Sequence, residues 1–359
     1  MVVFLFIVLL LVVSTVINKL LWGKKITVRE MAVNLGAMVF IFAIFWAISV
    51  SFSMLDTEIL SGKVIHKEIS KGSCEHGYPC HCYESCSGSG KNRSCYTHCD
   101  TCYEHSYDLS YIVESTIGNY LIARLDSQGL KEPPRYTEIA VEDPVSITHN
   151  YSNYIRGSNR SLFKDHVDFT KDEIKSFPKY PGKIYDYYKI DRIIDQAGLY
   201  SAEELVTLNG KLSRTLNDLA KEKQVNLVVV LTNNTEDYAL KLLSYWQGGK
   251  KNDVIIVIGV DSSKDITFVR VQSWTTNSLF SVRLRDSLLD LESLDSTKKF
   301  EQILSIASEE IKATYTRRAF KEFAYLKWQS MPSDGALFIF VLISLAISTG
   351  IGYLFSKNF

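Results

Sequence analysis

Seven cysteines between residues 74 and 102 are the side chains in this sequence most able to do chemistry. Their spacing is Cys74-x5-Cys80-x-Cys82-x3-Cys86-x8-Cys95-x3-Cys99-x2-Cys102, and the interleaved histidines are His76, His81, His98 and His105. The last three cysteines form a C-x3-C-x2-C pattern, a known spacing for the ligands of an iron–sulfur cluster. Such a cluster needs a reducing compartment, so the side of a membrane on which the segment lies decides whether it can form.

Two other interpretations of the cysteines remain open, and both give the segment a structural role. In the zinc interpretation, one tetrahedral set of ligands is formed by Cys80, Cys82, Cys99 and Cys102. The secondary candidates are Cys74, Cys86, Cys95, His76, His81, His98 and His105. In the disulfide interpretation, three bridges use six cysteines and leave one over, with a connectivity that spacing alone does not give. Either kind of bond would hold together a segment that is too small to fold on a hydrophobic core.

Apolar stretches lie at both ends of the chain, at residues 1–21, 31–54 and 335–355. A membrane-spanning helix needs about 20 predominantly apolar residues, so we predict three transmembrane helices. For residues 1–21 a cleaved signal peptide is an alternative, although a basic beginning and a small-x-small cleavage pattern are missing.

The loop between the first two apolar stretches sets the expected orientation. Residues 18–30 carry Lys19, Lys24, Lys25 and Arg29 against Glu30. Short basic loops stay in the cytoplasm, so residues 56–330 are predicted to face outward from a bacterial cytoplasmic (inner) membrane. An oxidising exterior excludes the iron–sulfur cluster. The formal net charge of zero argues against a nucleic-acid partner. The expected partners are therefore the lipid bilayer and other envelope membrane proteins.

The outward-facing region divides by composition into three parts. Residues 56–110 form the cysteine-rich module, and residues 111–183 are predicted to be a β-rich connecting module because short alternating runs lie between turn-forming residues. Residues 184–328 alternate between helical and strand patterns, which predicts an α/β domain with one mixed sheet. Its expected helices are 201–224, 235–247, 280–294 and 298–325, and its expected strands are 225–232, 253–260 and 266–272.

The α/β part resembles the TPM domain family over residues 188–315. The resemblance rests on an ordered set of segments: "RIIDQAGLYSAEEL", the leucine-spaced helix that follows, "QVNLVVVLT", "EDYALKLLSYW" and "GGKKNDVIIVIG". It implies a TPM-like layered domain of sheet and helices. The cysteine-rich module, with "RLDSQGLKEPPRY" and "HNYSNYI", is similar to membrane proteins of tailed bacteriophages.

The TPM resemblance implies a site for a divalent cation such as Ca²⁺ or Mg²⁺, together with acid phosphatase activity. The matching acidic positions are Asp195, Asp237 and Asp253, with Asp261 as a further candidate. Carboxylates at the ends of sheet strands can hold a hard cation, which neutralises phosphoryl charge. The chain departs from the family pattern in two loops: Lys251–Asp253 lacks the usual glycine, and Trp274 stands where a glycine-rich turn is expected.

These observations favour a membrane-anchored extracytoplasmic interaction or ligand-binding module over an enzyme. The alternative is a divalent-metal-dependent acid phosphatase that acts outside the cytoplasm. We expect the two hypotheses to be separated by whether Asp195, Asp237 and Asp253 converge in the folded chain.

Overall fold

A computed structural model describes residues 2–88, 90, 93–158 and 169–357. It divides into two compact units. A helical unit comprises Met1–Thr57, Asn150–Thr170 and Ala319–Phe359, and a second unit comprises Glu58–His149 and Lys171–Arg318. We describe each unit by itself.

Three long helices dominate the helical unit: α1 (Val2–Trp22), α2 (Val28–Ser53) and α10 (Asp334–Lys357). Leu10, Met38 and Phe42 form their buried core. Hydrogen bonds also join the three helices, because Asn18 donates to Ser348 Oγ at 2.9 Å and Asn34 donates to the Ser348 carbonyl at 3.1 Å. Polar contacts of this kind fix which faces of apolar helices meet.

The prediction of three membrane-spanning helices is corrected to two. Among the described residues, Val28–Ser53 and Gly335–Lys357 are long and apolar enough to cross a membrane. The first apolar stretch does form a helix, α1 (Val2–Trp22), but its described apolar part is the shorter stretch Leu10–Trp22. That stretch falls below the roughly 20 residues that a span requires.

Short elements complete the helical unit. The 3-10 helix η1 (Gly23–Lys25) connects α1 to α2, whereas α4 (Tyr154–Gly157) and the 3-10 helix η3 (Phe320–Gln329) contact each other. Just after α2, the buried carboxylate of Asp56 accepts hydrogen bonds from Tyr151 at 3.1 Å and Asn153 at 2.8 Å, and pairs with Arg156 at 3.1 Å. These contacts hold the segment that leaves α2.

The second unit begins with a four-stranded antiparallel sheet in the order β5-β4-β1-β6. Its strands are β1 (Leu55–Gly72), β4 (Asp108–Ser115), β5 (Gly118–Ile122) and β6 (Pro144–Ser152). The β strands expected at residues 111–183 thus share one sheet with the long strand β1, which lies outside that range. The short helix α3 (Pro134–Glu138) packs on it through Tyr136.

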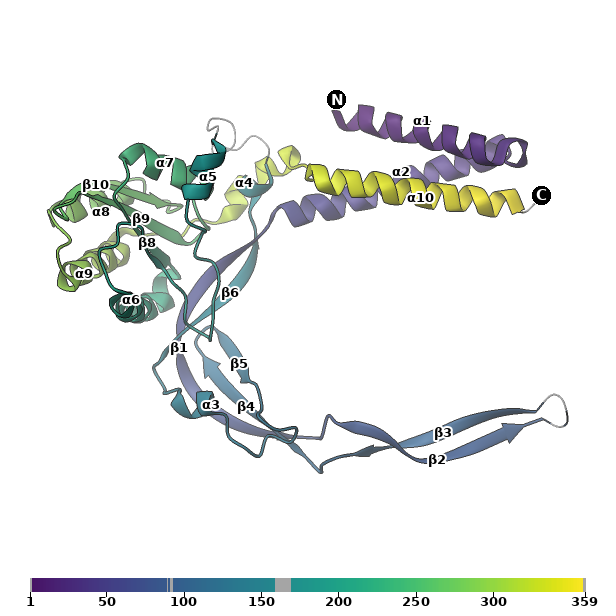
Figure 1. Ribbon diagram of the computed structural model, residues 1–359, viewed down its shortest axis with the longest axis horizontal. Helices are drawn as coiled ribbons and strands as arrows, with labels where there is room; N and C mark the ends of the chain where they lie inside the picture. Colours follow the sequence, from purple (N-terminus) through teal and green to yellow (C-terminus); the bar gives the residue numbers. More distant parts are fainter. Residues whose placement is uncertain (1, 89, 91–92, 159–168, 358–359) are drawn as a thin grey trace. The chain divides into compact units, whose positions relative to one another are not determined.

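Six of the seven cysteines lie in a separate two-stranded hairpin of β2 (Gly77–Ser87) and β3 (Ser94–Tyr103), and Cys74 precedes it. The cysteine-rich module expected at residues 56–110 is therefore shared between this hairpin, called the arm below, and β1. Figure 1 shows the two strands of the arm running side by side.

The α/β domain holds a mixed sheet in the order β10-β9-β8-β7. Strands β7 (Ile193–Asp195), β8 (Asn226–Thr232) and β9 (Asp253–Val260) are parallel, and β10 (Ile266–Ser273) is antiparallel to β9. Every residue of β8 and β9 is buried, as expected for parallel strands covered on both faces. The mixed sheet predicted from the sequence is thus confirmed.

The helices of this domain are α5 (Lys171–Ser176), α6 (Ala202–Lys223), α7 (Glu236–Tyr245), α8 (Phe280–Leu289) and α9 (Thr297–Thr314). The leucine-lined face of α6 packs into the main core with α8, α9 and the strands. The helix expected at 298–325 ends at Thr314, because Tyr315 is in extended backbone and inserts its buried ring beside Phe280.

A fully buried arginine joins the two sheets. Arg192 precedes β7 and has no exposed surface. Its guanidinium donates to hydroxyls of the antiparallel sheet, Ser61 at 3.1 Å and Ser146 at 3.0 Å. It also donates to Ser213 of α6 at 3.1 Å and Asn226 of β8 at 2.8 Å. One side chain therefore satisfies polar groups from four elements.

We predict that Arg192→Met destabilises the second unit by about 3–5 kcal/mol, because it leaves buried acceptors without their donor. Thermal unfolding of the full chain in detergent, followed by tryptophan fluorescence, measures the change. Arg214→Met on the exposed side of α6 is the matched control and should leave the midpoint within the error of the wild type. Equal midpoints for the two variants would contradict the role given to Arg192.

Candidate functional site

The sheet register separates two of the aspartates expected to share a cation. Asp195 ends β7 and lies opposite Leu231 of β8. Asp253 begins β9 and lies opposite Asn226 of β8. Asn226 and Leu231 are five positions apart, which is about 16 Å along a strand. Asp195 and Asp253 therefore stand at opposite edges of the sheet and do not form one site.

The other two aspartates have local partners. The side chain of Asp237, in the first turn of α7, is 70% exposed and pairs with Lys241 at 3.0 Å. Asp261 follows β9, and its Oδ1 accepts hydrogen bonds from the backbone N–H groups of Ser263 at 2.8 Å and Asp265 at 2.9 Å. Asp261 thus closes a tight turn, a common use of aspartate.

Asp253 is buried in a ring of donors. Its carboxylate accepts hydrogen bonds from Tyr180 Oη at 2.7 Å, Asn226 Nδ2 at 2.9 Å and the Lys250 backbone N–H at 2.6 Å. Burial raises the pKa of Asp253 to about 6 despite these donors. Both carboxylate oxygens accept hydrogen bonds from protein groups, so Asp253 has a structural role where β8 and β9 begin.

A second buried acid, which the sequence did not single out, lies in the same unit. Glu58 of β1 has no exposed surface and pairs with His149 at 2.8 Å, Lys251 at 2.7 Å and Arg317 at 2.5 Å. These partners come from β6, the turn before β9 and the segment after α9. We call Glu58, Asp253, Arg192 and the groups bonded to them the polar seam.

One sequence signal for the polar seam was present. Asn226 and Asp253 each begin a strand and are followed directly by an apolar run, and Arg192 stands just before the apolar start of β7. Polar residues at strand beginnings that are buried must find partners, so three of them at neighbouring strands indicate one network. Glu58 carries no comparable signal, because it ends a run of three polar residues, Asp56-Thr57-Glu58.

Asp195 differs from Asp253 in its surroundings. Its Oδ2 accepts a hydrogen bond from the Tyr200 backbone N–H at 2.9 Å. Its Oδ1 is buried and has no hydrogen-bond partner among the residues the structure describes. Asp195 lies at the carboxyl end of β7, the kind of edge at which open α/β sheets bind ligands.

The arm is cross-linked by three disulfides: Cys80–Cys102, Cys82–Cys99 and Cys86–Cys95. The four cysteines proposed as one zinc set are thus paired with each other, and so are the secondary candidates Cys86 and Cys95. A sulfur in a disulfide is not a thiolate, so these residues as they stand do not fit a zinc site. The disulfide interpretation is supported over the zinc interpretation.

Nearly all of the arm is exposed. In the described parts of β2 and β3, Cys80 and Cys102 are half-buried and the other residues are exposed. The exposed side chains include Tyr78, Tyr83, Tyr96 and Tyr103. An isolated two-stranded hairpin is marginal in water, so the disulfides supply the constraint that a core would otherwise give.

The histidines and the seventh cysteine do not all gather into one site, although the rings of His76 and His105 lie 6.3 Å apart and the His76 backbone N–H donates to Cys74 Sγ at 3.3 Å. His98 stacks on Tyr83, whereas His76 and His105 contact Ser127 at 3.2 and 3.1 Å. Cys74 is a buried free thiol near Asp108 at the base of the arm. The backbone N–H of Glu75, and then Arg124, hold the pKa of Asp108 below its usual value against the opposing effect of burial.

Comparison with known families agrees with the α/β fold. Residues 193–276 match the TPM domain. The matched segment runs from β7 through β10 and so contains the whole mixed sheet. The chain therefore contains a TPM domain, within the range expected from the sequence.

Comparison with solved structures gives a more distant similarity. The N-terminal domain of a protein from P. gingivalis shares 16% identity, with 36% of this chain and 87% of that domain covered, at a TM-score of 0.25. No curated protein matches the chain. The resemblance to bacteriophage membrane proteins stays a prediction.

The raised pKa of Asp253 predicts a pH dependence of stability. The folded state holds the Asp253 proton up to about pH 6, whereas the unfolded chain releases it near pH 3.8. The stabilising effect of that proton is complete below pH 3.8 and is lost as the pH rises through 6. The free energy of unfolding, relative to Asp253→Asn, should fall by about 3 kcal/mol over this interval.

Chemical denaturation of the full chain in detergent at a series of pH values measures this difference. Asp237→Asn, at an exposed carboxylate, is the control and should follow the wild type throughout. A difference between wild type and Asp253→Asn that stays constant from pH 4 to pH 7 would show that Asp253 does not titrate in this range.

Proposed function

We propose that the protein is a membrane-anchored extracytoplasmic interaction module, which displays the arm and the TPM domain to other membrane proteins of the envelope. Two apolar helices, α2 and α10, support the anchoring. Three disulfides support an oxidising location for the arm, since disulfides persist outside the cytoplasm. The basic loop before α2 supports the outward orientation from a bacterial inner membrane.

The observation that carries the interaction role is the exposed, cross-linked arm. A hairpin without a core adds little to the stability of the rest of the fold, yet its two strands present four tyrosines to solvent. Tyrosine is enriched in protein interfaces because its ring offers a large apolar area and its hydroxyl a hydrogen bond. Rigid, exposed tyrosines on a covalently fixed hairpin suit contact with another protein.

Site-specific photo-crosslinking in cells tests this role. A photoreactive amino acid at Tyr96 of the arm, 65% exposed, should give discrete higher-mass adducts under ultraviolet light. The matched control is the same amino acid at Val206 of α6, 74% exposed, which should give none of these adducts. An arm that yields no adduct, or the same adducts at both positions, would contradict the proposal.

Protease treatment of spheroplasts tests the orientation in the same cells. If residues 58–318 face outward, added protease should degrade them without detergent, while a cytoplasmic marker protein stays intact. Protection of this region until detergent is added would place it inside and overturn the extracytoplasmic assignment.

The separation of Asp195 from Asp253 counts against a cation site shared by the three aspartates. A second candidate function, a divalent-metal-dependent acid phosphatase, therefore rests on one observation at Asp195 alone. The buried Oδ1 of Asp195 has no hydrogen-bond partner among the described residues and lies at the ligand-binding edge of the sheet. A carboxylate oxygen in this state suits a hard cation such as Mg²⁺ or Ca²⁺.

The phosphatase hypothesis predicts hydrolysis of p-nitrophenyl phosphate by the purified full chain, dependent on added Mg²⁺ or Ca²⁺. Asp195→Asn should lower the rate at least about 100-fold, a loss typical of removing a group that stabilises transition-state charge. Asp286→Asn, at an exposed carboxylate of α8, should retain the rate. Absence of metal-dependent hydrolysis in the wild type would exclude this candidate.

A further inference from the structure

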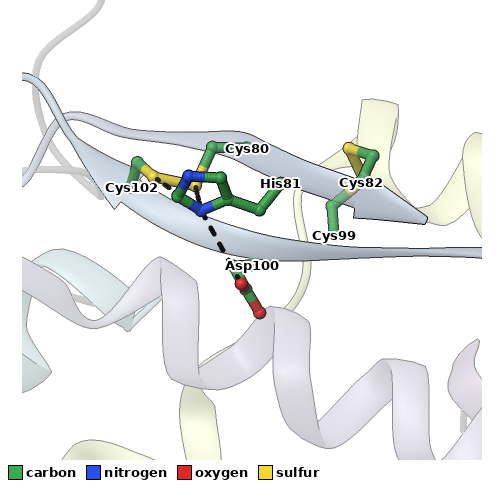
Figure 2. Close-up of a disulfide and its surroundings, with 6 residues drawn as sticks. All are labelled: Cys80, His81, Cys82, Cys99, Asp100 and Cys102. Atoms are coloured by element: carbon green, nitrogen blue, oxygen red, sulfur yellow. Dashed lines mark hydrogen bonds and ion pairs between the residues drawn. A yellow bond between two sulfur atoms is a disulfide. The ribbon is translucent and has the colours of Figure 1, made fainter.

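The three disulfides of the arm have different chemical neighbours. His81 lies beside Cys80–Cys102, with its Nδ1 at 3.6 Å from Cys80 Sγ and 4.0 Å from Cys102 Sγ. The carboxylate of Asp100 lies 3.8 Å from the same nitrogen. Figure 2 shows the imidazole ring between the disulfide and Asp100, with Cys82–Cys99 further along the strands.

Cys86–Cys95 has a neighbour of the opposite charge. The Glu84 carboxylate and the two sulfurs of this bridge lie within 4.8 Å of one another. Cys82–Cys99 belongs to neither group. Nested on one hairpin, the three bridges therefore form a natural comparison: one beside an imidazole, one beside a carboxylate and one beside neither.

The local backbone places His81 against the sulfurs. The register of β2 and β3 shifts between Cys80 and Tyr83, and His81 takes a positive φ of 45° at this irregularity. In a regular strand, consecutive side chains point to opposite faces, so His81 would point away from Cys80. The irregular backbone allows both side chains to meet.

We propose that Cys80–Cys102 is a thiol–disulfide exchange site, with His81 as its catalytic acid and a small-molecule or protein thiol as its substrate. The proposal rests on the contacts of the arm and is independent of the proposed function. Exchange is faster when the leaving thiolate is stabilised, and a protonated imidazole stabilises a thiolate directly. A carboxylate has the opposite effect, because it repels the attacking thiolate.

The reaction balances with two thiols as reductant. A first thiolate attacks Cys102 Sγ and forms a mixed disulfide, while the bond to Cys80 breaks and the Cys80 thiolate takes the His81 proton. Cys80 is the leaving group because its sulfur is closer to Nδ1. A second thiolate attacks the substrate sulfur of the mixed disulfide and releases the Cys102 thiolate. Two substrate thiols are oxidised to a disulfide, and one bridge of the arm is reduced.

The position of this bridge gives the exchange a structural consequence. Cys80 and Cys102 lie near the start of β2 and the end of β3, at the base of the arm. Reduction of this bridge removes the covalent link between β2 and β3 at the base of the arm, while Cys82–Cys99 and Cys86–Cys95 still link the two strands further out. Exchange would thus make the base of the arm more flexible without unfolding the rest of the hairpin.

Timed reduction of the full chain in detergent tests the proposal. The protein is treated with limiting glutathione at pH 7, quenched with N-ethylmaleimide, and digested for mass spectrometry of each cysteine. We expect Cys80 and Cys102 to be labelled at least about tenfold faster than Cys86 and Cys95. Equal rates, or faster labelling of Cys86 and Cys95, would overturn the proposal.

Substitutions separate catalysis by His81 from a structural effect. His81→Gln should slow reduction of Cys80–Cys102 by about three- to tenfold and leave the other two bridges unchanged, whereas His81→Lys keeps a cation and should restore most of the rate. Glu84→Gln is the matched control and should speed only the reduction of Cys86–Cys95. A His81→Gln variant in which all three bridges change together, or none does, would refute the role of His81.

Discussion

The second unit depends on the hydrogen bonds that the fully buried guanidinium of Arg192 donates. The guanidinium satisfies Ser61 and Ser146 from the antiparallel sheet together with Ser213 and Asn226 from the TPM domain. Burial lowers the pKa of Arg192 to about 10, and Asp253 opposes that effect. Because a buried charge without partners costs several kcal/mol, the two sheets are held in one arrangement by the need to keep these donors and acceptors together.

The arm is stabilised in a different way. The TPM domain buries both faces of β8 and β9, whereas the described strands of the arm bury almost nothing. Its constraint is covalent, and each closed loop reduces the entropy of the unfolded chain. A hydrophobic core unfolds cooperatively, whereas separate disulfides can be reduced one at a time. This difference is what allows chemistry at one bridge without loss of the fold.

Sequence patterns predicted the TPM domain well because its elements are long and periodic. The leucine spacing of α6 favours a helix, and the short runs of β8 and β9, rich in valine and isoleucine, favour strands. The pairing of the cysteines was beyond prediction, since it depends on the register of β2 and β3 and on the irregularity at His81. The aspartates that the phosphatase alternative would bring together are separated for a topological reason: Asp195 ends a parallel strand, whereas Asp253 begins one. Two such positions lie at opposite ends of the parallel strands.

The polar seam also decides where ligand chemistry can occur in the TPM domain. At the amino-terminal edge of the sheet, Asp253 is occupied by Tyr180 and Asn226, and Lys251 is paired with Glu58. A ligand there would have to displace bonds that hold the two sheets together. At the carboxyl-terminal edge, Asp195 Oδ1 has no hydrogen-bond partner among the described residues, so a ligand there would displace no bond to this oxygen. The amino-terminal ends of the strands are thus taken up by packing between the two sheets, whereas the carboxyl-terminal ends are where open α/β sheets usually bind ligands.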